Sequence, residues 1–151
     1  MVKEENKLDF VKSQLKMQSD ARETSIPPAP AAYQMRPALS ETFKSERIRE
    51  IIQTVLTETL TVFFFPGQTY TAADASRWTK SLADEISLKV KDLEMYRYKH
   101  VVQVMLGQQL GAGCKYVSRC RWDTECDNYA TAEFKNSTIF CVVTVYGLYL
   151  Y

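Results

Sequence analysis

The chain has 151 residues, 46% of them hydrophobic, and its 19 basic and 18 acidic residues leave a net charge of +1. This length favours one compact domain, and the near-neutral charge argues against nucleic acid as a partner, because phosphate backbones are bound by a basic excess. The charged N-terminus lacks the apolar stretch of a signal peptide, and no run reaches the roughly 20 apolar residues of a membrane span, so we expect an intracellular protein without a membrane partner.

The first 43 residues are expected to stay outside the folded domain. Residues 1–22 carry mixed charges, with Leu8, Val11 and Leu15 at helical spacing, which fits a transient or a partner-dependent helix. Residues 26–33 contain three prolines, which remove backbone donors and hold the chain extended. We therefore assign residues 1–43 to a flexible tail and residues 44–151 to the folded domain.

Two segments have the apolar spacing of amphipathic helices, and both need a common apolar surface. The first, residues 43–63, has Ser45 as its expected cap, ends before Pro66-Gly67, and repeats apolar residues every three or four positions: Ile48, Ile51, Ile52, Val55, Leu56, Leu60 and Phe63. The second, residues 71–94, begins with Thr71 three residues before Asp74, a spacing that satisfies free amides at a helix start. Its apolar stripe is Ala75, Trp78, Leu82, Ile86, Val90 and Leu93.

Four segments rich in β-branched and aromatic residues follow: residues 98–108, 114–123, 129–135 and 138–151. Short polar or glycine-rich connections separate them, as expected of a meander of antiparallel hairpins. The last segment is apolar almost throughout, so both of its faces need cover; helices can cover one, and we expect a partner chain to cover the rest. The predicted fold is α+β, with two helices packed on a four-stranded antiparallel sheet.

Few residues suggest catalysis or metal binding. The single histidine, His100, has no second histidine to share a metal, and we assign it a structural or solvated role. Cys114, Cys120 and Cys126 lack the close cysteine pair of a zinc site, and without a secretory signal they and Cys141 are expected to be reduced. Phosphate-loop, serine-elbow and zinc-protease motifs are also missing from the sequence. We expect no enzyme activity, no cofactor and no metal.

Three surface features have two interpretations each. Arg119 and Arg121 beside Val117 fit a docking stripe for an acidic or extended partner segment, and equally a solvated face whose charges suppress aggregation. Trp122-Asp123 fits a packed aromatic residue followed by a turn-capping acid better than a propeller blade, because nothing repeats it. The Phe63-Phe64-Phe65 cluster fits core at a helix end better than a ligand box.

The order of these elements, together with several short motifs, resembles the Tctex-type dynein light chains over residues 33–151. The motifs are Tyr98-Lys99, Val101-Val102-Gln103-Val104, Gly107-Gln108-Gln109, Ser118-Arg-Cys-Arg-Trp-Asp123, Phe140-Cys-Val-Val and Tyr146-Gly147. The approach from Tyr33 to Pro37 and the entry Arg97-Tyr98-Lys99 are more similar to the Tctex-2 branch, associated with ciliary and flagellar outer arm dyneins.

The resemblance implies a strand-exchanged dimer with a Tctex-type light chain, in which a Tctex-1-type partner is favoured over a second copy. It also implies that the dimer holds dynein intermediate chain segments as added strands, and through them associates with dynein heavy chains and microtubules in the axoneme and cytoplasm. By position in the motif, the edge offered to such a segment contains Lys115, Val117, Arg119 and Arg121. The residues implied for the core and dimer contact are Phe140, Val142, Val143, Val145 and Tyr146.

Two other functions also fit the sequence. One is a Tctex-type adaptor of intraflagellar transport or cytoplasmic dynein that links cargo to the motor. The other is a thiol-dependent enzyme built on Cys114 or Cys120, which would require a thiol of low pKa. The long tail departs from the minimal family domain, which leaves open whether it docks on a neighbouring dynein subunit.

Overall fold

The computed structural model describes residues 33–63, 70–111 and 113–151. The helix expected in residues 1–22, the proline segment before Tyr33, the pair Phe64-Phe65 and the helix stop at Pro66-Gly67 lie outside these residues. Gln34–Tyr151 forms one compact unit. Its elements are, in chain order, the short 3-10 helix η1 (Leu39–Glu41), α2 (Ser45–Phe63), α3 (Ala72–Lys91), β1 (Tyr98–Gln108), β2 (Asn128–Lys135) and β3 (Ile139–Tyr149).

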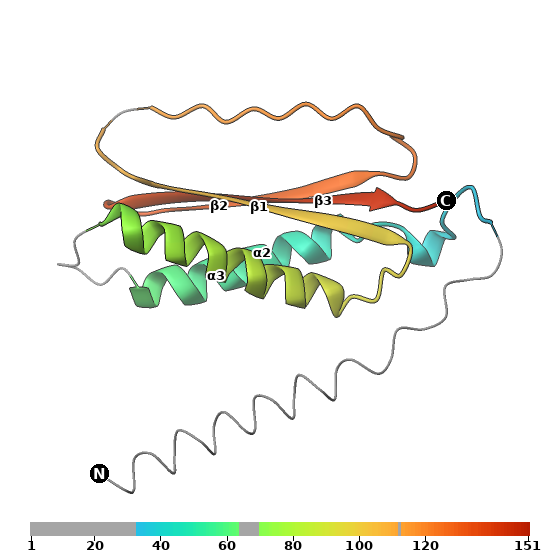
Figure 1. The fold of residues 1–151 in the computed structure, drawn as a ribbon, viewed down its shortest axis with the longest axis horizontal. Helices are drawn as coiled ribbons and strands as arrows, with labels where there is room; N and C mark the ends of the chain where they lie inside the picture. The colour runs from blue at the N-terminus through green and yellow to red at the C-terminus, as the bar shows by residue number, and fades with distance from the viewer. Residues whose placement is uncertain (1–32, 64–69, 112) are drawn as a thin grey trace, which may run out of the picture. The chain divides into compact units, whose positions relative to one another are not determined.

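The unit is α+β, as predicted, with α2 and α3 lying across one face of an antiparallel sheet (Figure 1). The strand order is β1-β3-β2, so β3 pairs with β1 on one side and with β2 on the other. The predicted meander is therefore wrong. The most apolar strand lies at the centre, where its own chain pairs both of its edges and helices cover one of its faces.

Helix α2 forms where the apolar spacing predicted it. The helix begins at Ser45 itself, so Ser45 is its first residue and not its cap; the amide of Ile48 donates to the carbonyl of Lys44 at 3.0 Å. Several β-branched residues weaken the local helix propensity, so packing must supply its stability. The residues of its stripe that become fully buried are Ile48, Ile52, Val55, Leu56 and Leu60.

Helix α3 confirms the predicted start. The amide of Asp74 donates to Oγ1 of Thr71 at 3.1 Å, and that hydroxyl donates to Oδ2 of Asp74 at 2.7 Å. The helix ends at Lys91, before the predicted residue 94, where Glu94 adopts a left-handed φ of 55°. The predicted stripe is buried from Ala75 to Val90. Neither α2 nor α3 has the length and apolarity that crossing a membrane requires.

One core fills the space between the helices and the sheet. Its strand side chains come from alternate positions of β3, among them Cys141, Val143 and Val145, each 0% exposed. His100 of β1 points toward α3, and its Nε2 lies 2.8 Å from Oγ of Ser87. This contact places the half-buried histidine in the packing between β1 and α3. Burial, and then the charge of Lys91, lower the pKa of His100.

Candidate partner-binding surface

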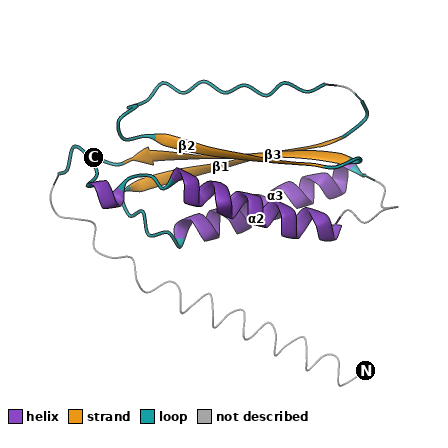
Figure 2. Ribbon diagram, turned by 180° about the vertical axis from the view of Figure 1, so that it is seen from behind, coloured by secondary structure: helices purple, strands orange, loops and turns teal. Residues whose placement is uncertain are grey.

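The segment predicted as the second strand, residues 114–123, pairs with no strand among the described residues. Figures 1 and 2 show that the chain leaves β1, runs extended on the side of the sheet away from the helices, and returns to enter β2. We call residues 114–121 the arm. Among the described residues the sheet therefore has three strands and not the four expected, and the arm lies unpaired although the outer edges of β1 and β2 have no strand partner.

The arm has two different sides. The four residues predicted to form a partner edge are all exposed: Lys115, Val117, Arg119 and Arg121. On the opposite side, the hydroxyl of Tyr116 donates to Oε1 of Gln103 at 2.8 Å and lies 3.5 Å from the hydroxyl of Tyr146. The arm contains three basic residues and no acidic residue. The arm is thus positively charged and is exposed at every position except Tyr116, which connects it to the sheet.

The sheet surface turned away from the helices, which we call the outer face, divides the predicted contact residues into two groups. Val143 and Val145 face the helices and belong to the core. Phe140, Val142 and Tyr146 alternate with them, lie on the outer face and are only half-buried. The proposed dimer contacts of β3 are therefore restricted to these last three residues.

Aromatic residues gather where the arm rejoins the outer face. The ring centroid of Trp122 lies 6.3 Å from that of Tyr129 and 6.2 Å from that of Tyr146, and the two tyrosine rings are 6.3 Å apart. Oδ1 of Asp123 accepts a hydrogen bond from the amide of Glu125 at 2.9 Å. The predicted packed aromatic residue followed by a turn-capping acid is confirmed.

Two residues that shape the outer face, Gln103 and Gly107, were not predicted from the sequence. Gln103 accepts the hydrogen bond from Tyr116. The signal in the sequence was the alternation of residues 98–108, which sets Gln103 on the opposite face from Val102 and Val104. Gly107 lies directly beneath the ring of Phe140, where an added Cβ would come within 2.5 Å of that ring. In the sequence Gly107 stands out only as part of the motif Gly107-Gln108-Gln109, but in the structure it also makes room for an aromatic residue of the central strand.

The cysteines divide into an exposed pair and a buried pair. All four cysteines are free; Cys114 and Cys120 are exposed on the arm, while burial raises the pKa of Cys126 and raises that of Cys141 to about 12. The two buried thiols therefore stay protonated at neutral pH. Within the described ranges, no cluster of three histidine, cysteine or acidic side chains could hold a metal ion.

Comparison with known proteins gives consistent matches. A model of the Tctex-1 family matches residues 42–148, which include both helices, the arm and most of the sheet. Dynein light chain Tctex-type protein 2B of Danio rerio is 38% identical over 119 residues, covering 79% of this chain and 76% of the relative. The Homo sapiens protein of the same name is 36% identical, with 79% and 80% covered. Dynein light chain Tctex-type 4 of Sus scrofa is 35% identical, and the match spans 81% of this chain and 53% of that relative.

Proposed function

The chain belongs to the Tctex-1 family, and on this premise we propose that it is a non-catalytic dynein light chain. It pairs with a Tctex-type partner by exchanging the arm, and the dimer binds dynein intermediate chain segments as added strands. Through this pairing it assembles and docks an axonemal dynein, of the outer arm, that drives ciliary motility. The unpaired arm is the observation that carries the proposal, and the type 2B relatives support the Tctex-2 branch.

Exchange is favoured because both the arm and the sheet edges have backbone groups without a strand partner. The arm makes no ladder hydrogen bonds in a single chain, and the outer edges of β1 and β2 have no strand partner among the described residues. Such edges pair readily with other chains. Each backbone hydrogen bond contributes about 0.5–1.5 kcal/mol net, so one strand laid along a partner's edge supplies a substantial part of a dimer's stability.

The outer face supplies the apolar contact that accompanies exchange. Val101 and Tyr129 are 51% and 52% exposed, and Phe140, Val142 and Tyr146 between them are half-buried. Water-exposed apolar area of this kind is stabilised by a second protein surface. A partner of the same fold presents a matching face, which supports pairing with a Tctex-1-type chain or with a second copy.

Once exchanged, the arm has one edge left, and this edge accepts the intermediate chain segment. Backbone hydrogen bonds form with a segment of any sequence, so selectivity comes from side chains at alternate positions. Val117, Arg119 and Arg121 are exposed at such positions. The two arginines favour an extended segment with acidic residues opposite them.

Reversing both arm arginines is expected to weaken this binding. The Arg119→Glu/Arg121→Glu variant should bind a synthetic dynein intermediate chain segment about tenfold more weakly than the wild type, measured by titration calorimetry, because two attractive charge contacts become repulsive. The reversal should not change the dimer, whose formation uses the backbone of the arm.

A matched control reverses two exposed basic residues on the helices, Arg47 and Lys89, whose ion pairs lie within their own helices. This Arg47→Glu/Lys89→Glu control is expected to bind the segment as the wild type does. Equal affinities for all three proteins would contradict the proposed edge.

Co-purification from isolated axonemes distinguishes the outer arm role from an adaptor role, in which transport particles would be recovered without axonemal heavy chains.

A further inference from the structure

The turn at which the arm ends, residues 123–127, is held in place from within and by the sheet. The carbonyl of Asp123 accepts from the amide of Asp127 at 2.8 Å, and Oδ2 of Asp127 accepts from the amide of Asp123 at 3.1 Å. The sheet adds two bonds: the hydroxyl of Tyr98 donates to the carbonyl of Cys126 at 2.8 Å, and the amide of Tyr149 donates to Oδ1 of Asp127 at 2.8 Å. The base of the arm therefore has a defined position.

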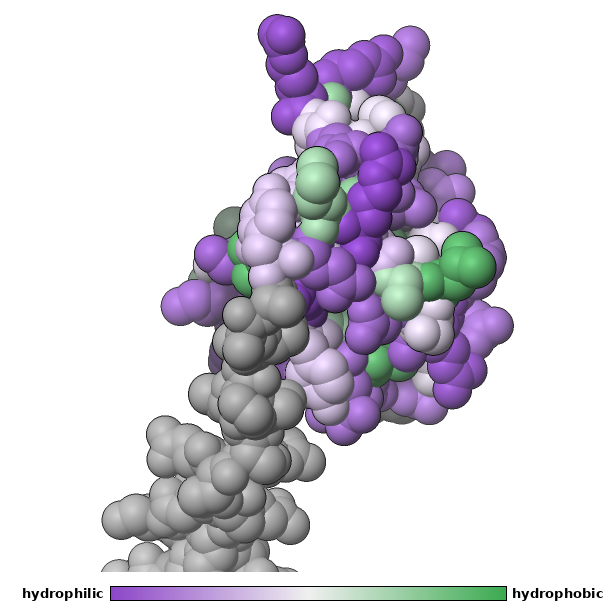
Figure 3. Space-filling view, turned by 90° about the vertical axis from the view of Figure 1, so that its right-hand side faces the viewer, coloured by the Kyte–Doolittle hydropathy of each residue, from purple (hydrophilic) through white to green (hydrophobic). Residues whose placement is uncertain are grey.

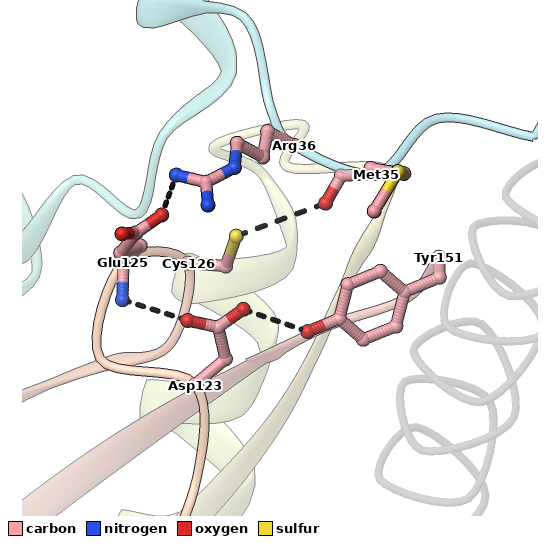
Figure 4. Close-up of polar contacts among 6 residues, drawn as sticks. All are labelled: Met35, Arg36, Asp123, Glu125, Cys126 and Tyr151. Atoms are coloured by element: carbon pink, nitrogen blue, oxygen red, sulfur yellow. Dashed lines mark hydrogen bonds and ion pairs between the residues drawn. The ribbon is translucent and has the colours of Figure 1, made fainter.

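The same turn contacts the segment that precedes α2. Figure 4 shows the guanidinium of Arg36 paired with the carboxylate of Glu125, and the thiol of Cys126 directed at the carbonyl of Met35 at 4.0 Å. The C-terminal Tyr151 approaches from the other side, and its hydroxyl donates to Oδ2 of Asp123 at 3.0 Å. This hydrogen bond raises the pKa of Tyr151 to about 12, so the donor stays protonated at neutral pH.

The segment before α2, residues 34–43, is itself attached to the sheet at two points. The ring of Phe43 packs against Gly147 and lies 5.8 Å from the ring of Tyr98, and the hydroxyl of Tyr149 donates to the carbonyl of Gln34 at 3.3 Å. Between these points the segment includes η1 and no fully buried residue. Most of the surface at this end of the compact unit is hydrophilic (Figure 3).

We propose that residues 34–43 act as a latch on the turn 123–127, and that the closed latch fixes the direction in which the arm leaves the sheet and so prepares the arm for exchange. The inference rests on the proposed function, because it concerns the arm that a Tctex-type partner receives. It assigns Arg36 and Glu125 a role in dimer formation although neither residue lies on the arm or on the outer face.

The physical basis is preorganisation. An arm whose base is held loses less conformational entropy when it pairs with a partner edge than an arm whose base moves freely. The side chains of Arg36 and Glu125 are 65% and 54% exposed, so their ion pair is weakened by salt and opens at little cost. Any ligand that displaces residues 34–43 would thereby change how readily the arm exchanges.

Charge reversal in the full-length chain tests the latch. Arg36→Glu is expected to speed amide hydrogen exchange in residues 123–127 about two- to fivefold, as the loss of one exposed ion pair predicts, and to weaken dimerisation by a similar factor. The double variant Arg36→Glu/Glu125→Arg restores the attraction and should return both values to those of the wild type. Dimerisation is measured by sedimentation with a fluorescent second copy of this chain and, separately, with a Tctex-1-type chain.

The matched control is Arg47→Glu, which breaks a similarly exposed pair with Glu50 on α2, far from the turn in sequence. This control should leave residues 123–127 and the dimer unchanged. The latch is contradicted if Arg36→Glu behaves like Arg47→Glu, or if the charge-swapped double variant fails to recover. If the wild-type chain dimerises neither with a second copy nor with a Tctex-1-type chain, the proposed function is overturned instead. Amide hydrogen exchange in residues 123–127 of Arg36→Glu then still decides whether the latch holds the turn.

Discussion

Proline in place of Val117 is expected to separate the dimer into its two chains without unfolding either of them. In the single chain the arm makes no ladder hydrogen bonds, and Val117 is 60% exposed, so the substitution costs the monomer little. In an exchanged strand, proline removes a backbone donor and disrupts pairing around it. We expect the dissociation constant to rise about 100-fold or more, measured by light scattering and sedimentation with a Tctex-type partner present.

Val117→Thr is the matched control, because threonine keeps the backbone donor and the β-branched shape. It should dimerise nearly as the wild type does. The circular dichroism spectra and melting temperatures of the isolated chains should agree for all three proteins. A proline variant that still dimerises at wild-type affinity would mean that the arm does not pair with a partner strand.

Alanine in place of Gly147 is expected to lower the free energy of unfolding by about 2–3 kcal/mol, near the upper end of the range for overpacked cores. An added Cβ would lie 2.1 Å from Cδ2 of Phe43, and Phe43 is only 7% exposed. The ring cannot stay where it is, so the substitution displaces Phe43 and with it the end of the latch that leads into α2. Urea denaturation of the full-length chain measures the loss.

Two further variants test whether Phe43 is the cause. Gly113→Ala adds the same methyl group where nothing lies within 4 Å, and it should change stability by less than about 0.5 kcal/mol. Phe43→Ala alone is expected to lower the free energy of unfolding by about 3 kcal/mol. In the double variant with Gly147→Ala the two losses should not add, because the added methyl group no longer meets the Phe43 ring. Additive losses would show that Gly147 matters for another reason.

The helices and the strand faces were predictable because they depend on local spacing. Repeats of three and four residues placed α2 and α3 and identified most of their buried side chains. The sequence alternates along residues 98–108, and in β1 Val102, Val104 and Leu106 pack against the core while Val101 and Gln103 lie on the outer face. Thr71 and Asp74 marked a helix start because the capping bond is formed between near neighbours.

Strand order could not be obtained in this way, because it depends on pairing between distant segments. The uniform apolarity of β3 was interpreted as a need for a partner chain, whereas its central position between β1 and β2 accounts for much of it. A partner is favoured by the unpaired arm and by the half-buried outer face. The ion pair of Arg36 with Glu125 joins positions far apart in sequence, so no local pattern predicts it.

The most direct test of arm exchange asks which chain the arm touches. A dimer is assembled from one copy labelled with deuterium and nitrogen-15 and from a Tctex-type partner carrying carbon-13, and nuclear Overhauser effects are recorded between the two labels. Arm exchange predicts contacts from the amides of residues 115–121 to an edge strand of the other chain, at the spacing of paired strands. Arm exchange is contradicted if the dimer forms but the arm amides contact only their own chain or no strand at all.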